Sequence, residues 1–272
     1  MRVAYQGEPG AFSERAVRRL FPTADPMPCE TVRIVFSRVT SGEADFGVVP
    51  IENSQAGTVN ETYDLLSGSD LVRIVGEAVV RVDHALVAPP GARLEGITRA
   101  SSHWQALAQT EEFLARHHIE PVPAHDTAGA ARLVAERGDP TEAAVASVEA
   151  ARNLGLTVLA ERIQTYPENY TRFVAIGTRD ADLGPAGKTS LVLAVRDEPG
   201  SLLACLRGFA EHGVNLVKLE SRPRRGAPFE YLFHVDLLGT PDDPEVAAAI
   251  ETARAHTSML RVLGSYPAGT IE

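Results

Sequence analysis

The sequence predicts an α/β protein built from two segments of different architecture. Short apolar runs that suit strands alternate with amphipathic stretches that suit helices as far as Gly177. A stretch rich in glycine, proline and aspartate, residues 180–187, interrupts the alternation and is typical of a linker. The elements after it follow the order βαββαβ, which indicates a ferredoxin-like arrangement with helices on one face of an antiparallel sheet.

Length and charge narrow the class of protein. With 272 residues the chain exceeds one average domain, and we expect a first domain over residues 1–180 and a second over 188–272. A net charge of -10 disfavours nucleic acid as a partner. An anionic ligand must therefore be held by local arginine, lysine or helix N-termini against the overall field.

The expected location is the reduced cytoplasm. No run approaches the roughly 20 apolar residues of a membrane helix, and the N-terminus enters a strand without a secretory leader. Cys29 and Cys205 are far apart and form no metal-ligand spacing. No dinucleotide loop is visible either, so we expect neither a metal nor a cofactor, and no membrane partner.

The chain begins with a strand, a glycine loop and a helix. Residues 2–5 predict the strand, Gly7–Gly10 the turn and residues 12–20 the helix, whose start offers free N–H groups to an anion. By itself this unit is a weak signal. A helix over 32–39 and a buried strand over 45–51 come next.

Polar residues follow that strand directly. Glu52, Asn53 and Ser54 stand at its carboxyl end, where open α/β sheets place their ligands. Asn53 and Ser54 also suit the cap of the next helix, which we predict over residues 59–66, and the two roles are compatible.

The middle of the chain continues the alternation. We predict strands over residues 71–75, 79–87, 97–100, 120–124, 143–147 and 157–160, and helices over 102–114, 128–136 and 148–153. Such an order implies a mostly parallel sheet with helices on its faces. Ser102 and His103 then lie at one helix start, and Asp126 and Thr127 at another. A cleft between two lobes can gather these loops with Glu52–Ser54.

The stretch Asn169–Phe173 leads from polar residues into an apolar run, which predicts a strand that begins with a hydroxyl, a guanidinium and an aromatic ring. Because side chains alternate along a strand, Thr171 and Phe173 share one face and Arg172 takes the other, unless a bend brings all three around one ligand. An isolated Thr-Arg-Phe tripeptide indicates no more than a strand. The first three residues also match an N-glycosylation acceptor, which requires a secreted chain.

The second segment supplies the elements of the βαββαβ order. We predict strands over residues 188–195, 214–220, 229–237 and 258–263, and helices over 200–211 and 244–256. The open edges of such a sheet commonly need a partner, so we expect a homodimer or homotetramer.

Seven stretches together resemble one family. In chain order they are Gly7–Glu14, Pro50–Ser54, Ser102–Gln109, Asp126–Ala131, Asn169–Phe173, Asp197–Leu203 and Glu220–Pro223. Each is weak alone, but in this order they are specific, and nearly the whole chain is similar to prephenate dehydratases with a C-terminal ACT domain. The resemblance implies a two-lobed catalytic domain like that of periplasmic binding proteins, followed by an ACT regulatory domain. With no mutase segment before Met1 and no dehydrogenase after the last residue, the chain resembles the monofunctional form.

The resemblance implies a carbon–oxygen lyase that converts prephenate to phenylpyruvate in phenylalanine biosynthesis. It points to Thr171 as the proton donor to the departing hydroxyl. A threonine hydroxyl is a poor acid, so a relay from Glu52 or His103 is an alternative. Arg172 suits a grip on the pyruvyl carboxylate, because clamping the carboxylate that leaves would stabilise the ground state. Phe173 suits an apolar wall that keeps the leaving carboxylate dry.

We expect the remaining polar residues to orient the substrate by hydrogen bonds. Orientation can contribute on the order of 7–11 kcal/mol, whereas general acid assistance gives about 10²–10⁴-fold. The expected substrate contacts, besides Asn53 and Ser54, are Ser102, His103, Gln105, Asp126, Thr127 and Asn169. For His103 the alternative is a helix-capping or packing role, and for Glu52 it is the orientation of Asn53.

In the second domain the resemblance implies an L-phenylalanine site that lowers activity. A loop that enters a helix offers free N–H groups to an α-carboxylate, and a following bend can hold the loop. The residues concerned are Gly200, Ser201, Leu202, Leu203, Glu220, Ser221, Arg222 and Pro223. Many members carry Ala-Leu-Val after the loop glycine where this chain has Ser201–Leu203, which leaves the effector and its strength open. The alternative is a purely structural dimerisation domain.

Two other functions remain open at this point. Arogenate dehydratase acts on a substrate that differs by one amine in place of a keto group. A non-catalytic amino-acid-binding sensor would use the same cleft, although the lack of a leader and the Thr171–Phe173 stretch weigh against it.

Overall fold

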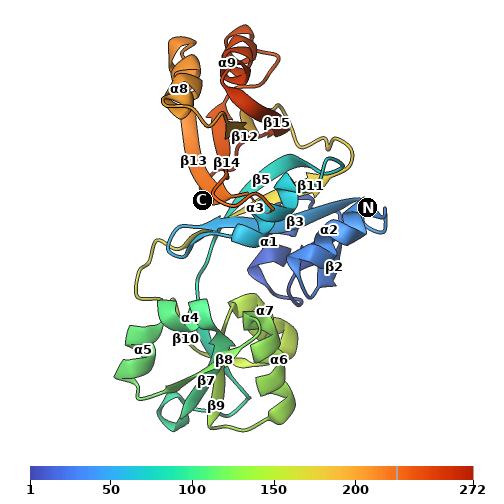
Figure 1. Ribbon diagram of the computed structural model, residues 1–272. Helices are drawn as coiled ribbons and strands as arrows, with labels where there is room; N and C mark the ends of the chain where they lie inside the picture. Colours follow the sequence, from blue (N-terminus) through green and yellow to red (C-terminus); the bar gives the residue numbers. More distant parts are fainter. Residues whose placement is uncertain (225, 272) are drawn as a thin grey trace. The chain divides into compact units, whose positions relative to one another are not determined.

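The computed structural model describes residues 1–224 and 226–271, which form two compact units (Figure 1). Unit 1 comprises residues 1–60, residues 78–173 and the C-terminal residues from Thr270, and unit 2 comprises residues 61–77 and 174–269. Helix α3 (Asn60–Ser67), except for its first residue, therefore groups with the C-terminal segment. No helix in the described part of the chain is both long and apolar enough to cross a membrane.

The first sheet has the strand order β2-β1-β3-β11-β5, with β4 beside β3. The strands are β1 (Arg2–Gln6), β2 (Asp25–Cys29), β3 (Phe46–Asn53), β4 (Gly57–Thr58), β5 (Arg73–Arg81) and β11 (Tyr170–Gly177), and the first two helices are α1 (Phe12–Leu20) and α2 (Val32–Thr40). β1 pairs in parallel with both β2 and β3. This parallel arrangement brings the ends of β1 and β3 to the same edge, where Gly7 follows β1 and Asn53 is the last residue of β3.

The second sheet lies wholly in unit 1 and has the order β10-β6-β9-β7-β8. Its strands are β6 (Ala85–Ala88), β7 (Arg99–His103), β8 (Glu120–Ala124), β9 (Glu142–Ala146) and β10 (Thr157–Glu161). β7 runs parallel to β8 and β9, whereas β6 runs antiparallel to β9 and β10. The predicted mostly parallel sheet is therefore confirmed here, with the entering strand β6 as the exception.

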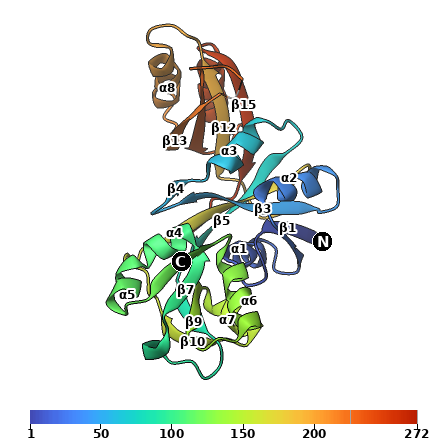
Figure 2. The ribbon, with the colours of Figure 1, turned by 60° about the horizontal axis from the view of Figure 1, so that its bottom comes forward.

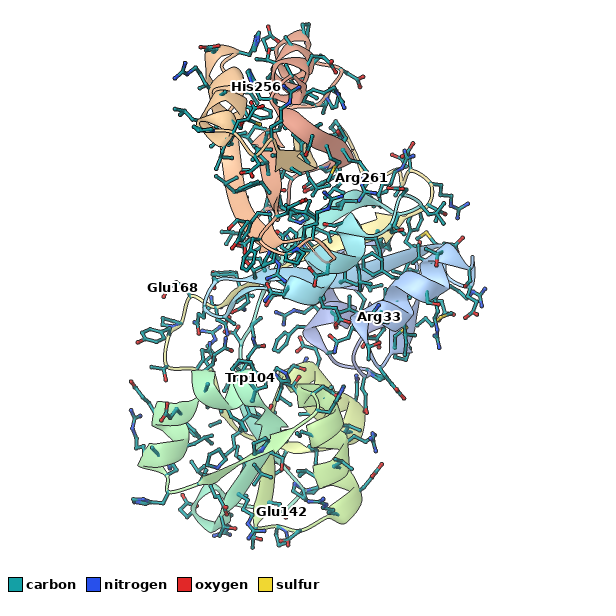
Figure 3. All side chains as sticks on the ribbon, viewed as in Figure 1. Arg33, Trp104, Glu142, Glu168, His256 and Arg261 are labelled. Carbon is teal, nitrogen blue, oxygen red and sulfur yellow. The ribbon has the colours of Figure 1, made fainter. Side chains whose placement is uncertain are left out.

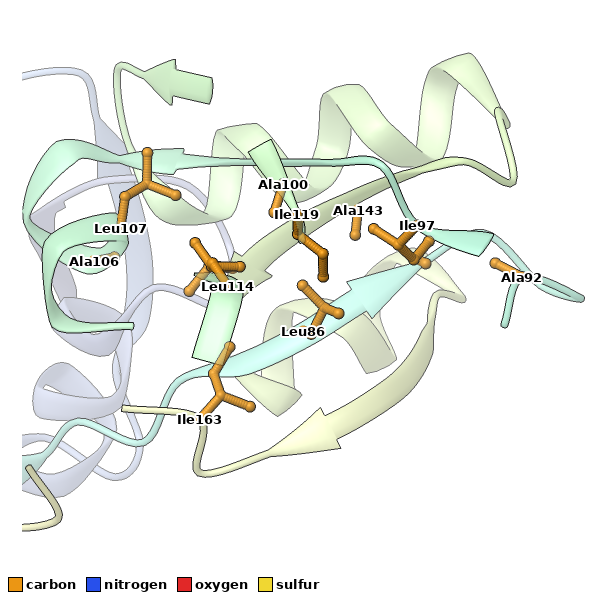
Figure 4. Packing of buried hydrophobic residues seen from close by; sticks show 12 residues of the cluster. Leu86, Ala92, Ile97, Ala100, Ala106, Leu107, Leu114, Ile119, Ala143 and Ile163 are labelled. Carbon is orange, nitrogen blue, oxygen red and sulfur yellow. The ribbon is translucent and has the colours of Figure 1, made fainter. Parts of the chain in front are cut away.

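Helices cover both faces of the second sheet. They are the short η1 (Leu94–Gly96), α4 (Trp104–Gln109), α5 (Glu111–Arg116), α6 (Thr127–Arg137) and α7 (Val148–Leu154). Figure 2 shows α4 and α5 on one side and α6 and α7 on the other. Leu86, Ile97, Leu114 and Ile119 pack between the sheet and α4 and α5 (Figure 4), and an alanine-rich cluster fills the other side.

Several boundaries differ from those predicted. β5 is continuous through Gly76, where a break between two strands is expected from the glycine. Ser102 and His103 are the last residues of β7, and His103 is also the N-cap of the helix that begins at Trp104. The helix predicted as far as Leu114 is two helices, because the buried Thr110 leaves helical geometry while its hydroxyl bonds to the helix carbonyls before it.

Unit 2 contains the predicted βαββαβ segment. Its elements are β12 (Lys188–Val195), α8 (Ser201–Glu211), β13 (Leu216–Pro223), β14 (Tyr231–Leu238), α9 (Pro244–Arg254) and β15 (Thr257–Tyr266). The sheet order is β13-β14-β12-β15, and all its pairs are antiparallel. Leu193, Phe209, Val235 and Ile250 form the core beneath α8 and α9. Glu220–Pro223 end β13 and are not the bend that the sequence suggests.

Candidate active site

The site is organised around the side chain of Asn53 at the end of β3. Its Oδ1 accepts the backbone N–H groups of Gln55 at 3.0 Å and Ala56 at 2.8 Å. Because a backbone N–H can only donate, these bonds fix which way the amide faces. Its Nδ2 then lies 2.8 Å from Oδ1 of Asn169 and 2.9 Å from Oγ1 of Thr171. Asn53 therefore donates a hydrogen bond to the Thr171 hydroxyl.

This contact leaves the Thr171 proton available for another acceptor. A hydroxyl has one proton and two acceptor sites, and Asn53 occupies one of the acceptor sites. A group bound beside Thr171 can therefore receive its proton or a hydrogen bond from it. The local geometry suits the donor role that the resemblance implies for this residue.

Arg172 lies on the opposite side of the strand pair from Thr171. Its Nη2 is 3.3 Å from Oε2 of Glu52. The two strands thus form two successive cross-strand pairs, Glu52 with Arg172 and Asn53 with Thr171. This follows the alternation of side chains on neighbouring strands. Phe173 is buried. The three residues of the Thr-Arg-Phe stretch thus enter different surroundings, without the bend that would gather them around one ligand.

Two further side chains extend the polar cluster into the protein. Asn169, which is fully buried, donates through Nδ2 to Oε1 of Gln109 at 2.9 Å, and Nε2 of His84 lies 2.8 Å from the same oxygen. Burial lowers the pKa of His84, so the imidazole is neutral. Neither Gln109 nor His84 is predicted as a site residue, although Gln109 closes the Ser102–Gln109 motif.

Ser54 joins β3 to the segment that returns from the second lobe, which is the part of unit 1 that contains the second sheet. Its Oγ donates to the carbonyl of Glu168 at 3.2 Å and accepts the N–H of Tyr170 at 3.0 Å. Glu168 marks this returning segment in Figure 3. Ser54 thereby holds the start of β11, which carries Thr171, against the end of β3, which carries Asn53.

Three of the predicted residues of the second lobe, Ser102, His103 and Asp126, make local structural contacts. Ser102 is fully buried and donates to the carbonyl of Val145 at 2.6 Å. Asp126 caps α6, and Thr127 is the first residue of that helix. Nδ1 of His103 accepts the N–H of Gln105 at 3.3 Å, and burial with the nearby His125 lowers its pKa.

None of the five predicted side chains of this lobe, those of Ser102, His103, Gln105, Asp126 and Thr127, hydrogen-bonds to Asn53 or Thr171 in the part of the chain that the structure describes. The neighbouring Trp104 is 62% exposed (Figure 3). The structure thus brings Asn53, Thr171 and Asn169 together, and joins Gln109 and His84 to them.

A cavity of about 410 Å³ lies between loops of the two lobes, within unit 1. It is lined by the turn at Glu8, the end of β2 and the start of α6, including Asp126. Glu8 crosses it to Arg132, with Oε2 2.9 Å from Nε and Oε1 3.2 Å from Nη2. Within residues 1–224 and 226–271, no group of three or more histidine, cysteine or acidic side chains is placed to hold a metal ion.

The predicted effector residues lie in unit 2. Gly200 takes a left-handed conformation (φ 88°) that favours glycine, and it leads into α8, whose N-terminus has no side-chain cap among the described residues. Arg222 of β13 pairs with Asp64 of α3 at 3.4 Å. The uncapped helix start is open to a carboxylate, whereas Arg222 is already held by α3.

α3 also covers a buried histidine of the second unit. His234 packs against the ring of Tyr63 at 4.5 Å between centroids, and its Nε2 lies 3.1 Å from Oγ of Ser67. The pKa of His234 is lowered to about 4, chiefly by burial, so the imidazole is uncharged at neutral pH. α3 thus packs within unit 2 through its contacts with Arg222 and His234.

Fold and site together define a two-lobed α/β protein with a polar site at strand ends and a separate βαββαβ domain. The model of the prephenate dehydratase family matches residues 3–181, and that of the ACT domain matches residues 189–255. The chain belongs to the prephenate dehydratase family. The family and the fold class expected from the sequence are confirmed.

Three similar proteins are named for different activities. "Arogenate dehydratase 5, chloroplastic" of Arabidopsis thaliana is 40% identical over 98% of this chain and 67% of its own length. The structure of a prephenate dehydratase in complex with L-Phe from Arthrobacter aurescens is 36% identical, with a TM-score of 0.89 over 98% of this chain and 89% of that one. The structure of GqqA, described as a novel type of quorum quenching acylases, is also 36% identical, with a TM-score of 0.90 over 99% and 98% of the two chains.

Proposed function

We propose that this protein is a prephenate dehydratase. The reaction releases the ring carboxylate of prephenate as carbon dioxide and the ring hydroxyl as water, takes up one proton, and leaves phenylpyruvate. Within a chain of this family, the strongest support is the bond that Thr171 accepts from Asn53, because it leaves the threonine proton available to a bound group. Thr171 supplies a hydrogen bond or proton to the departing hydroxyl, and formation of the aromatic ring drives the reaction.

Incubation of the purified protein with prephenate, and separately with arogenate, tests this function. We expect prompt formation of phenylpyruvate from prephenate and little phenylalanine from arogenate. The reverse preference would assign the chain to the arogenate dehydratases. A further arm with an N-acylated amide substrate, in which release of the free acid is followed, tests the acylase activity named for one similar structure. Inactivity with all three, together with tight amino-acid binding, would support the sensor.

We propose that Arg172 and Glu52 act as a pair that fixes the start of β11. Their side chains are 13% and 37% exposed, and a partly exposed pair of this kind stabilises the fold by up to about 1 kcal/mol. When all of this energy serves to position β11, its loss changes the rate by roughly fivefold. We expect Arg172→Ala and Glu52→Gln to lower kcat by similar, roughly fivefold factors with little change in KM.

Steady-state kinetics of both variants and of the double variant check this pairing. Non-additive losses in kcat support it. A large rise in KM confined to Arg172→Ala would instead assign the guanidinium to a substrate carboxylate, the role that the sequence alone favours.

We propose that the ACT domain binds L-phenylalanine and lowers activity, and that the protein is a cytoplasmic homo-oligomer. The uncapped start of α8 at Gly200 and the L-Phe complex of a similar prephenate dehydratase support the effector. Edge strand β13 supports pairing between copies, because Val217 and Leu219 are each 47% exposed on it. Repeating the prephenate assay with added phenylalanine, beside calorimetry, tests the effector, and unchanged activity without binding would leave a dimerisation domain.

A further inference from the structure

We propose that His84 is a positioning residue for the dehydration, acting on Thr171 through Gln109, Asn169 and Asn53. The proposal rests on the function proposed above. His84 stands between β5 and β6, outside every stretch that carries the family resemblance, and its side chain is 2% exposed. It reaches the site only through the other side chains, so it contacts no substrate.

The direction of each hydrogen bond in this series is fixed from the end at Asn53. Two backbone N–H groups hold Oδ1 of Asn53, so its Nδ2 donates to Oδ1 of Asn169 at 2.8 Å. Asn169 must then present Nδ2 to Gln109, whose Oε1 accepts at 2.9 Å. Gln109 in turn directs its own Nε2 at Oδ1 of Asn53, at 3.4 Å. Gln109 thus shows an oxygen, and not an NH₂ group, to His84.

That oxygen determines the tautomer of His84. Nε2 lies 2.8 Å from Oε1 of Gln109, so Nε2 carries the proton and donates it. Nδ1 is buried and has no hydrogen-bond partner in the described part of the chain. A bare ring nitrogen tolerates such a place better than an N–H group, because an unsatisfied buried donor is costly. Both nitrogens therefore agree on one tautomer.

The surroundings hold the ring in this orientation. The backbone N–H of His84 donates to Oε1 of Gln164 at 3.0 Å, and Gln164 donates through Nε2 to Asp83 at 3.0 Å. The ring of Phe12 meets the imidazole edge to face, with 5.8 Å between the centroids. The backbone and ring contacts leave Nε2 directed at Gln109.

Loss of the His84 donor removes one of the hydrogen bonds that Oε1 of Gln109 accepts, at the end of the series opposite Asn53. The Gln109 amide can then turn over and place its NH₂ opposite the NH₂ of Asn169, which displaces Asn169 and, through it, the Asn53 amide. Gln55 and Ala56 still fix the direction of the Asn53 amide, but its position relative to Thr171 is no longer held from the Asn169 side. Misplacement of a catalytic group by a fraction of an ångström to 1 Å costs up to about 10²-fold in rate. We therefore expect His84→Phe to lower kcat by about 10- to 100-fold with little change in KM.

Prephenate kinetics of three variants test the proposal. His84→Phe keeps an aromatic ring but removes the donor, whereas His84→Gln can restore an N–H near the position of Nε2 and is expected to recover most of kcat. Thr110→Val is the matched control, because it removes the buried hydroxyl that bonds to Ala106 beside Gln109 without touching the series. Wild-type kcat in a folded His84→Phe variant, or equal losses in Thr110→Val, would overturn the proposal.

Nitrogen NMR of the unchanged protein, with labelled histidine, remains decisive if the variants do not fold. We expect the His84 imidazole to be protonated at Nε2 alone. A proton on Nδ1, or rapid exchange between the two tautomers, would overturn the proposal. The wild-type assay separates the two failures: absence of any activity on prephenate removes the proposed function, whereas an active wild type with an unaffected His84→Phe variant removes only the role of His84.

Discussion

Thr171→Ala is expected to lower kcat on prephenate by about 10²- to 10⁴-fold, the usual contribution of a positioned acid, while KM changes only modestly. The variant lacks the Thr171 hydroxyl, which accepts a hydrogen bond from Asn53, but the other contacts of the substrate remain. An interaction made chiefly in the transition state affects kcat more than KM.

Thr171→Ser is the matched control for this variant. It retains a hydroxyl that can accept from Asn53 and is expected to keep kcat within about tenfold of the wild type. Thermal unfolding of both variants excludes a loss of fold. If serine were as inactive as alanine, the methyl group and its packing would matter instead of the hydroxyl. A rise in KM without a fall in kcat would make Thr171 a binding residue only.

Asn53→Asp is expected to lower kcat by at least about 10²-fold, although it changes one NH₂ group to an oxygen. One carboxylate oxygen can still accept the N–H groups of Gln55 and Ala56. The other can only accept, so it draws the proton of Thr171 towards itself and repels Oδ1 of Asn169. The hydrogen bond to Thr171 is reversed, and its proton no longer faces the substrate.

Combination with Thr171→Ala distinguishes this explanation from general damage. Residues that act as a unit are strongly non-additive, so the double variant is expected to be little worse than either single one. Asn153→Asp, an exposed change of the same chemistry on α7, is the control for the added charge. Additive losses, or an unaltered kcat in Asn53→Asp, would contradict the proposed direction of the bond.

The order of elements could be predicted from sequence where hydrophobic periodicity is strong. The βαββαβ order and the helix capped by Asp126 are examples. β2 could not, because Asp-Pro-Met-Pro-Cys carries two prolines, which are tolerated since it is an edge strand. The association of α3 with the C-terminal segment is not predictable either, because the contacts of Asp64 and Tyr63 join residues far apart in sequence.

The candidate site was predictable to the extent that its residues stand in short motifs. Asn53, Asn169 and Thr171 belong to such stretches, and the structure brings them together. The role of Ser102 in the core was not predictable, because a serine at a strand end has the same pattern whether it faces a cleft or a neighbouring carbonyl. His84 has no local signal, since its link to Gln109 depends on burial and packing.

The series from His84 to Thr171 is made of neutral amides, one uncharged imidazole and one hydroxyl. Dissolved ions weaken attraction between exposed charges, but they have little effect on uncharged groups joined by short hydrogen bonds. The Arg172–Glu52 pair is partly exposed and lacks this protection. The position of the reactive hydroxyl is thus expected to be insensitive to ionic strength, even though the molecule as a whole is strongly acidic.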